Sequence, residues 1–311
     1  MERIIAEISD NWRAGKPLEA HTSGSTGTPK PITLSHELVR DSAWRSIRHF
    51  GLTADSHLHL CLSPDYIAGK MVIIRALEAC CSLSWEPASS HPRLNAPKPI
   101  TLLSIVGTQL PGLQQLKEHG NLPSIKHLLL GGAPLTAAQR TLALTLADEA
   151  WESYGMTETA SHIALRHVDD PWFYPLDSIN LGTDDRGCLR IELPHSEPLL
   201  TNDIIEFQPD TQGFRVLGRA DNVIITGGLK VHPEQVEALL APYFHGDIML
   251  TSVPDPKWGQ LLVLQTESTT IPTDWDTLVA TLLPPHQRPR RIEQVPSLPR
   301  TSNGKLRRHR K

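Results

Sequence analysis

The chain has 311 residues, more than one ordinary domain core requires, and this length predicts one large domain plus a smaller one. Its 30 Lys and Arg residues against 34 Asp and Glu give a formal charge of -4, and neither sign forms a long block before the C-terminus, so we expect no nucleic-acid partner. No stretch of about 18 apolar residues occurs, so we also expect no membrane partner.

The cysteines and the N-terminus favour a reducing compartment. The four cysteines contain no C-x-x-C pair and two of them are adjacent, which suits neither a disulfide framework nor a zinc site; they are Cys61, Cys80, Cys81 and Cys188. The first 17 residues, MERIIAEISDNWRAGKP, lack the apolar core of a signal peptide. We therefore expect a soluble, cytoplasmic protein.

A helix is predicted directly after a Ser/Thr/Gly-rich loop at residues 22–30. Ser35 is a suitable N-cap, and the apolar residues that follow it recur at helical spacing up to Phe50. Gly51 then stands where a left-handed C-cap is wanted. The loop therefore runs into a well-capped helix.

Short apolar strands then alternate with helical segments as far as Tyr154. The predicted strands are 57–62, 101–106, 126–130 and 151–154, and the predicted helices include 69–80 and 136–150. This alternation predicts an α/β fold whose sheet is mostly parallel and flanked by helices.

The character of the sequence changes at Gly187. Strands predicted at 188–193, 203–207 and 213–217 form a small antiparallel unit. A strand at 222–226, a helix at 233–240, strands near 248–253 and 261–266 and a helix near 273–283 then suit a small α+β domain. We therefore expect a large domain at 1–220 and a small C-terminal domain at 221–311.

The loop at 22–30 has the composition of a polyphosphate site. Hydroxyls, close backbone approach and one mobile cation come from Ser23, Gly24, Ser25, Thr26, Gly27, Thr28 and Lys30. It is not a Walker loop, because its two glycines are too close together and Pro29 precedes the lysine. A flexible surface loop could share this composition, so the loop alone predicts only an anion site.

The string T-S-G-S-T-G-T-P-K at 22–30 resembles the phosphate loop of the adenylate-forming superfamily, which contains acyl-CoA synthetases, carrier-protein adenylation domains and luciferases. Further motifs of that family follow in the expected order. They are Gly131-Gly132-Ala133 with Tyr154-Gly155-Met156-Thr157-Glu158, Thr201-Asn202-Asp203, Gly218-Arg219-Ala220-Asp221 with Gly227-Gly228-Leu229-Lys230, and the C-terminal P-R-T-S-N-G-K ending at Lys305.

The resemblance implies roles for the first of these motifs. The ring of Tyr154 would stack on adenine beside the turn at 131–133, Thr157 would bind the α-phosphate, and Glu158 would help hold Mg²⁺. A hard cation accepts one carboxylate together with phosphates and water. Taken alone, Y-G-M-T-E could equally be a strand end with a solvated glutamate.

The later motifs receive roles in the same way. Asp203 would accept the ribose hydroxyls, although Asn202 replaces the family's middle glycine, and Arg219 would contact the ribose or phosphate. Asp221 would be the pivot of a mobile C-terminal domain, and Gly227, Gly228 and Lys230 would face the site during thioester formation. Lys305 would be the lysine required for adenylation, with Lys30 on the departing pyrophosphate. The implied cofactors are ATP and Mg²⁺, with CoA as co-substrate.

The run Thr159-Ala160-Ser161-His162-Ile163 is similar to o-succinylbenzoate–CoA ligases of menaquinone biosynthesis. Ser161 and His162 are therefore candidates for the acyl-substrate site. Lys70 lies where the family has an acyl-pocket motif and could meet a second carboxylate, although a snorkelling surface lysine is the favoured interpretation. The resemblance thus predicts an acid–CoA ligase whose small-molecule substrates are a carboxylic acid and CoA.

One departure concerns the N-terminus. Typical family members carry a large subdomain before the phosphate loop, so we expect that subdomain to be reduced or absent. Alternatives left open are another aryl or alkyl acid, loading of a carrier protein instead of CoA, and a non-catalytic nucleotide-binding relic. Retention of Lys30, Glu158, Asp203, Arg219 and Lys305 argues against the relic. The oligomeric state is not predicted.

Overall fold

The computed structural model describes residues 1–21, 30–194, 196–300 and 306–308. The chain divides into two compact units. The large unit contains Met1–Leu181, Ile191–Leu199 and Gln208–Phe214, and the small unit contains Gly182–Arg190, Leu200–Phe207 and Arg215–Lys311. The boundary between domains at 220 and 221 stays a prediction.

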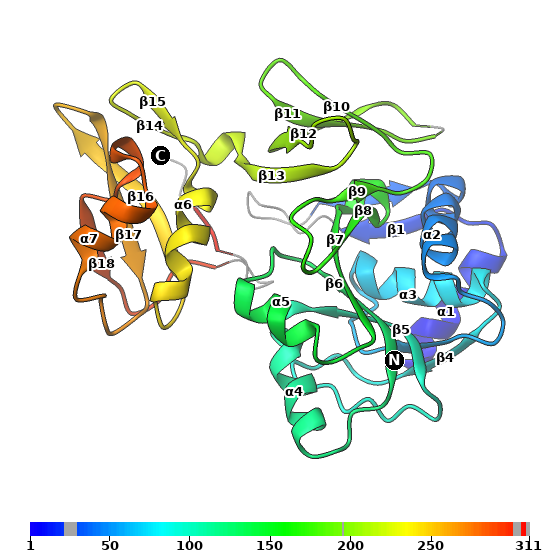
Figure 1. The fold of residues 1–311 in the computed structure, drawn as a ribbon. Helices are drawn as coiled ribbons and strands as arrows, with labels where there is room; N and C mark the ends of the chain where they lie inside the picture. The colour runs from blue at the N-terminus through cyan, green and yellow to red at the C-terminus, as the bar shows by residue number, and fades with distance from the viewer. Residues whose placement is uncertain (22–29, 195, 301–305, 309–311) are drawn as a thin grey trace. The chain divides into compact units, whose positions relative to one another are not determined.

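A seven-stranded sheet forms the centre of the large unit (Figure 1). Its order is β4-β3-β5-β6-β7-β8-β9, and the first five strands are parallel, whereas β8 pairs antiparallel with both β7 and β9. The bounds are β3 His57–Leu60, β4 Ser82–Trp85, β5 Ile100–Val106, β6 Ile125–Gly131, β7 Glu149–Gly155, β8 His162–His167 and β9 Tyr174–Pro175. The predicted mostly parallel α/β sheet is confirmed.

Helices flank this sheet and build two cores. α4 and α5 pack over β5, β6 and β7 through leucines such as Leu110 and Leu113. A second core joins α1, α2 and α3 to a two-stranded hairpin through Trp12, Val39 and Ile74. The helices are α1 Glu2–Arg13, α2 His36–Phe50, α3 Ile67–Glu78, α4 Leu110–Glu118, preceded by the 3₁₀ turn η1 Gly107–Gln109, and α5 Ala137–Ala143.

The hairpin consists of β1 Leu18–His21 and β2 Pro31–Leu34, which pair antiparallel. His21 lies opposite Pro31, so the two ends of the predicted phosphate loop are held beside each other. Residues 22–29 of that loop lie outside the described part of the chain. The helix predicted after it is confirmed, because Ser35 Oγ accepts from Leu38 N and Gly51 is left-handed, with φ 59°.

The helix predicted at 136–150 is wrong in length. Thr136 does cap α5, but the helix ends at Ala143 and the next turns bond Leu146 N to Ala143 O. β7 must pair in parallel with β6 from Glu149 onward, so the chain has to leave the helix early to reach that register. Leu146 still enters the core although it is not helical.

Four strands, β10 to β13, form a sheet in sequential order whose residues are shared between the two units. Their connections are far too short for parallel crossovers, so the strands run antiparallel, as predicted. The bounds are β10 Asn180–Thr183, β11 Cys188–Glu192, β12 Leu199–Phe207 and β13 Phe214–Arg219.

The rest of the small unit is an α+β structure. β14 and β15 form a hairpin, and β16, β17 and β18 form a sheet in which β17 pairs antiparallel with β16 and parallel with β18. α6 spans the predicted range, and it packs with α7 over a core that includes Val236 and Leu264. The bounds are β14 Ile224–Thr226, β15 Leu229–Val231, α6 Pro233–Leu240, β16 Ile248–Asp255, β17 Gly259–Thr266, α7 Trp275–Leu282 and β18 Arg291–Gln294, with 3₁₀ turns η3 Ala220–Asn222, η4 Ala241–Tyr243 and η5 Pro285–Gln287.

None of the helices in the described ranges is long and apolar enough to cross a membrane.

Candidate functional site

The Y-G-M-T-E motif lies where β7 ends and turns into the 3₁₀ segment η2, Thr157–Thr159. Gly155 sits at a register shift between β7 and β8. A Cβ added there would lie 2.4 Å from the carbonyl oxygen of Ser161, so only glycine allows the two chains to approach this closely. Thr159 Oγ1 closes the turn by donating to Ser161 O at 2.6 Å. The motif thus has a fixed backbone at the carboxyl end of the strand.

Glu158 offers the chemistry that a magnesium ion requires. Its side chain is half-buried in η2, and among the described residues no hydrogen-bond or ion-pair partner occupies its carboxylate. Those residues also contain no cluster of three or more His, Cys, Asp or Glu side chains placed to hold a metal. One carboxylate fits an ion whose remaining ligands are phosphate oxygens and water.

The turn Gly131-Gly132-Ala133 follows β6, the strand next to β7 in the sheet. Carboxyl ends of adjacent parallel strands meet at one edge, so the turn lies beside the Y-G-M-T-E segment. Gly132 has φ 91°, a backbone angle that favours glycine. Ser153 Oγ donates to Leu130 O at 2.9 Å and secures the start of the turn.

The ring of Tyr154 belongs to an aromatic group. It packs edge-on against Phe214, with centroids 5.2 Å apart, and lies 6.0 Å from the ring of Phe173. Arg166 stacks its guanidinium 4.3 Å from the Phe173 centroid. These contacts restrict the ring that the motif assigns to adenine.

The predicted ribose residues come together within the small unit. Arg219 Nη1 donates to Asp203 Oδ1 at 2.9 Å, and Arg219 Nη2 donates to Asp221 Oδ2 at 3.2 Å. Burial alone would lower the pKa of Arg219, but the hydrogen bond to Asp221 and the charges of both aspartates raise it. Asn202, which replaces the family's glycine, accepts a hydrogen bond from Arg186 at 3.0 Å.

The glycine loop is the two-residue connection of the β14–β15 hairpin. Gly227 and Gly228 have φ values of 56° and 78°, and two consecutive positive angles are typical of a tight hairpin turn. Gly227 N donates to Trp258 O at 2.9 Å. Lys230 is exposed on β15.

The three candidate acyl residues have different surroundings. Lys70 Nζ donates to the backbone oxygen of Glu19 at 2.7 Å, and partial burial lowers its pKa. Ser161 Oγ accepts from Arg75 Nη2 at 2.5 Å, and the Nε2 of buried His162 lies 2.9 Å from Ser46 Oγ. Ser161 and His162 therefore share one buried polar cluster, whereas Lys70 bonds elsewhere.

Arg75 is the residue of this cluster that sequence reasoning missed. It is 2% exposed, burial lowers its pKa to about 10, and its Nε has no hydrogen-bond partner among the described residues. A buried cation without a carboxylate is costly and marks a candidate functional group. The signal in the sequence was an arginine inside the apolar run Met71–Leu77.

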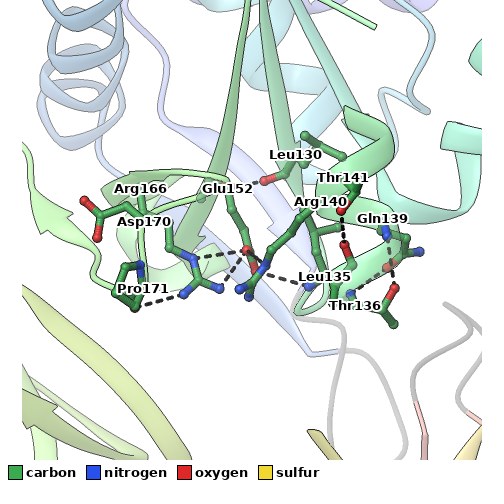
Figure 2. A network of polar contacts seen from close by, with 12 residues as sticks. Leu130, Leu135, Thr136, Gln139, Arg140, Thr141, Glu152, Arg166, Asp170 and Pro171 are labelled. Carbon is green, nitrogen blue, oxygen red and sulfur yellow. Dashed lines mark hydrogen bonds and ion pairs between the residues drawn. The ribbon is translucent and has the colours of Figure 1, made fainter. Parts of the chain in front are cut away.

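A second missed group is the buried ion-pair network of Glu152, Arg166 and Arg140 (Figure 2). Burial lowers the pKa of Arg166, and the charge of Glu152 opposes that effect.

The predicted site residues 22–28 and Lys305 lie outside the described residues. Lys30 is described and exposed.

Comparison with known proteins gives a family match. Residues 20–181 match the family described as AMP-binding enzyme. The chain is 25% identical to a 2-succinylbenzoate–CoA ligase of Listeria monocytogenes serotype 4b, covering 98% of this chain and 71% of that protein. It is 26% identical to the protein of the same name from Enterococcus faecalis, covering 93% and 68%.

Solved structures of adenylate-forming enzymes are also similar to this chain. An acyl-CoA synthetase (AMP-forming)/AMP-acid ligase II-like protein from Dyadobacter fermentans is 29% identical with a TM-score of 0.62, covering 96% of this chain and 89% of that one. The o-succinylbenzoate CoA synthetase of Bacillus subtilis, in complex with the acyl-adenylate intermediate OSB-AMP, is 22% identical with a TM-score of 0.81, covering 93% and 67%. The second likeness shows the fold alone.

Proposed function

The chain belongs to the AMP-binding enzyme family, and we propose that it joins a carboxylic acid to CoA through an acyl-adenylate, with release of pyrophosphate and AMP. The observation that carries this proposal is the meeting of the Y-G-M-T-E segment and the Gly131–Ala133 turn at one edge of the parallel sheet. Ligands of open α/β sheets bind at this edge. The names of the curated relatives support the reaction class.

A carboxylate must be activated before a thiol can attack it, since its own leaving group would be oxide. In the first step an oxygen of the acid attacks the α-phosphorus of ATP, a P–O bond forms, and pyrophosphate leaves. We assign Thr157 to the α-phosphate, and Lys30 and the loop at 22–28 to the pyrophosphate. Lys305 would stabilise the charge that develops at the reacting phosphate.

A magnesium ion would be held by Glu158 together with phosphate oxygens. When bound, it neutralises phosphate charge and polarises the reacting group. The turn closed by Thr159 supports this assignment, because it fixes the backbone that carries Glu158.

The base and the ribose would be held by separate groups. We assign the base to Tyr154 and the turn at 131–133, and the ribose to the Asp203–Arg219 pair. Charge-assisted hydrogen bonds such as Arg219 to Asp203 fix a carboxylate more firmly than neutral ones.

In the second step the sulfur of CoA attacks the acyl carbon, a C–S bond forms, and AMP leaves. We propose that residues 221–311 form a small domain that turns about Asp221 between the two steps. The turn would bring Gly227, Gly228 and Lys230 to the site of thioester formation. The tight β14–β15 turn supports this assignment, because its two glycines carry no side chains that would obstruct an approaching thiol.

We propose o-succinylbenzoate as the acid, on the names of the relatives and the buried polar cluster. This acid carries a second carboxylate, for which a cation without a carboxylate partner is suitable. Arg75 meets that requirement better than Lys70, because Lys70 already bonds to Glu19 O. Ser161 would orient Arg75 through the bond to its Oγ, and His162 Nδ1 lies 3.2 Å from that Oγ.

The test is an incubation of the full chain with ATP, Mg²⁺, CoA and one acid from a panel that contains o-succinylbenzoate, benzoate and octanoate. Nucleotide products are separated by chromatography, and thioesters are identified by mass spectrometry. The proposal predicts AMP and a CoA thioester, fastest with o-succinylbenzoate. Formation of ADP, or of no AMP with any acid, would contradict it. Replacing CoA by a phosphopantetheinylated carrier protein tests the other acceptor.

A further inference from the structure

Glu152 is a buried carboxylate on β7, two residues before Tyr154, and it connects two parts of the proposed base site. It is 3% exposed. Its Oε2 accepts from Arg166 Nε at 3.1 Å and from Arg166 Nη2 at 2.7 Å, and Arg140 Nε lies 3.2 Å away (Figure 2). Its Oε1 accepts from the backbone N of Leu135 at 3.2 Å.

The bond to Leu135 completes an anchor on the Gly131–Ala133 turn. Ser153 holds the residue before the turn through Leu130 O, and Glu152 holds Leu135 just after it. Two consecutive residues of β7 therefore hold the turn at both ends. The backbone groups of the turn are thereby fixed relative to the strand that carries Tyr154.

The bonds to Arg166 reach the Tyr154 ring by a second route. Arg166 also donates to Pro171 O at 3.0 Å and covers the ring of Phe173 at 4.3 Å. Phe173 in turn packs against Tyr154 and Phe214. A shift of the Arg166 guanidinium would therefore move a ring that borders Tyr154.

A negative charge is required at this position. Two guanidinium groups converge on Oε2, and removing the charge of a buried partner leaves the remaining cations uncompensated. A neutral amide could still accept from Leu135 N, but it would neither hold Arg166 with charge-assisted bonds nor attract the charge of Arg140.

We propose that Glu152 is a positioning residue that fixes the Gly131–Ala133 turn against the Tyr154 ring and so sets the preference of the site for adenine. This inference rests on the proposed function, since it takes the turn and the ring as the base site. Glu152 itself touches no substrate. It acts through Leu135 on one side and through Arg166 and Phe173 on the other.

The test is calorimetric titration of the full chain with ATP and with inosine triphosphate, whose base replaces the 6-amino group and N1 acceptor of adenine by a 6-oxo group and an N1–H donor. Glu152→Gln is expected to weaken ATP binding about tenfold, the effect of one good polar contact, and inosine triphosphate binding by less than about threefold. The readout is the Kd for inosine triphosphate divided by the Kd for ATP, because a purely structural defect would weaken the binding of both nucleotides to the same extent. An unchanged ratio would overturn the proposal.

Glu149→Gln is the matched control, since Glu149 starts the same strand, is half-exposed and pairs with His127 at 3.0 Å. It should leave both Kd values unchanged. If Glu152→Gln does not fold, Arg140→Gln replaces it, because the Arg140 side chain is 29% exposed. That variant should lower the ratio of the inosine triphosphate Kd to the ATP Kd about threefold, since only the Arg140 side of this ion pair is partly exposed. An unchanged ratio in this variant would then overturn the proposal.

Binding is measured without an acid substrate, so the two hypotheses fail separately. ATP binding with the predicted loss of selectivity, but without acid-dependent turnover, would support the role of Glu152 and contradict the proposed function. Acid-dependent turnover with unchanged base selectivity in the variants would support the proposed function and contradict the role of Glu152. No binding of ATP by the wild type would overturn both.

Discussion

Arg219 on β13 donates a hydrogen bond to Asp203 on β12 at 2.9 Å, although the two residues are 16 positions apart in the chain. The neighbouring strands of one sheet bring them together. Arg219 also bonds to Asp221, so one guanidinium orients two carboxylates. Two residues that the family resemblance assigned to the nucleotide therefore form one rigid pair.

Asp203→Asn should raise the KM for ATP. The amide loses one charge-assisted bond to Arg219 and accepts ribose hydroxyls less well, so we expect about a tenfold increase, or about 1.4 kcal/mol. Steady-state AMP formation measures it. Glu206→Gln is the control on the same strand, since its pair with Arg215 is half-exposed and contributes little. Equal KM values in the two variants would contradict the ribose assignment.

Arg75→Met should separate substrate recognition from stability. We expect the KM for o-succinylbenzoate to rise at least about tenfold and that for benzoate to stay unchanged, because only the former has a second carboxylate. The free energy of unfolding should not fall, since a buried cation without an acidic partner is replaced by an apolar chain of similar length. Kinetics with both acids and urea unfolding measure this.

The control for that variant is Arg45→Met. Arg45 is also 2% exposed, with Nε and Nη2 unpartnered among the described residues, whereas the hydrogen bond to Ser161 comes from Arg75. It should leave the ratio of the two KM values unchanged. If Arg75→Met raised the KM values for both acids to a similar extent and lowered the free energy of unfolding by several kcal/mol, Arg75 would be a structural residue.

Gly155→Ala should destabilise the large unit. The new Cβ would lie 2.4 Å from Ser161 O and 2.5 Å from His162 Cα, both backbone atoms that cannot turn aside. We expect a loss of more than about 2 kcal/mol in the free energy of unfolding, from forced backbone shifts. Gly182→Ala is the control, because nothing lies within 4 Å of its added Cβ. Equal stability of the two variants would show that the strands can separate at no cost.

Stability should fall on mild acidification because of His162. Burial, followed by the charge of Arg75, lowers its pKa well below 6.5 in the folded state. The unfolded chain therefore takes up a proton near pH 6.5 that the folded chain does not, and unfolding becomes easier as pH falls below that value. The loss for one such group approaches about 1.4 kcal/mol per pH unit.

Urea unfolding at pH 7.5, 6.5 and 5.5 measures this slope. His162→Gln should reduce it, although His49, His59 and His127, whose pKa values burial also lowers, keep part of it. The control is His119→Gln, since His119 is exposed on the surface and its ring Nδ1 bonds to Gln115 O in the preceding helical turn. The same slope in wild type and His162→Gln would contradict the account.

Local signals predicted several elements well. The helix at 36–50 has a cap at each end and a regular apolar face, and α6 begins at a proline suited to a first helical turn. The helix predicted through Ala150 failed because the pairing of β7 with β6 overrides the leucine pattern after Ala143. A short stretch of sequence does not reveal pairing with a strand that is distant in the chain.

The motifs likewise located the backbone of the site but not its supporting charges. Tyr154, Gly155 and Glu158 were found because their spacing is a family signature. Arg75 and Glu152 were missed, since an isolated charge in an apolar run does not reveal its partner. Their partners Ser161 and Arg166 come from β8 or its approach, and only the folded sheet brings them close.

The central claim is that this chain forms an acyl-adenylate, and acid-dependent exchange of labelled pyrophosphate into ATP tests it most directly. The account predicts exchange by the wild type with o-succinylbenzoate and a loss of about a hundredfold or more in Lys305→Ala, as for removal of a group that stabilises transition-state charge. Lys257→Ala, which changes an exposed lysine over Trp258, should exchange normally. No exchange with any acid, or equal exchange in Lys305→Ala, would contradict the account.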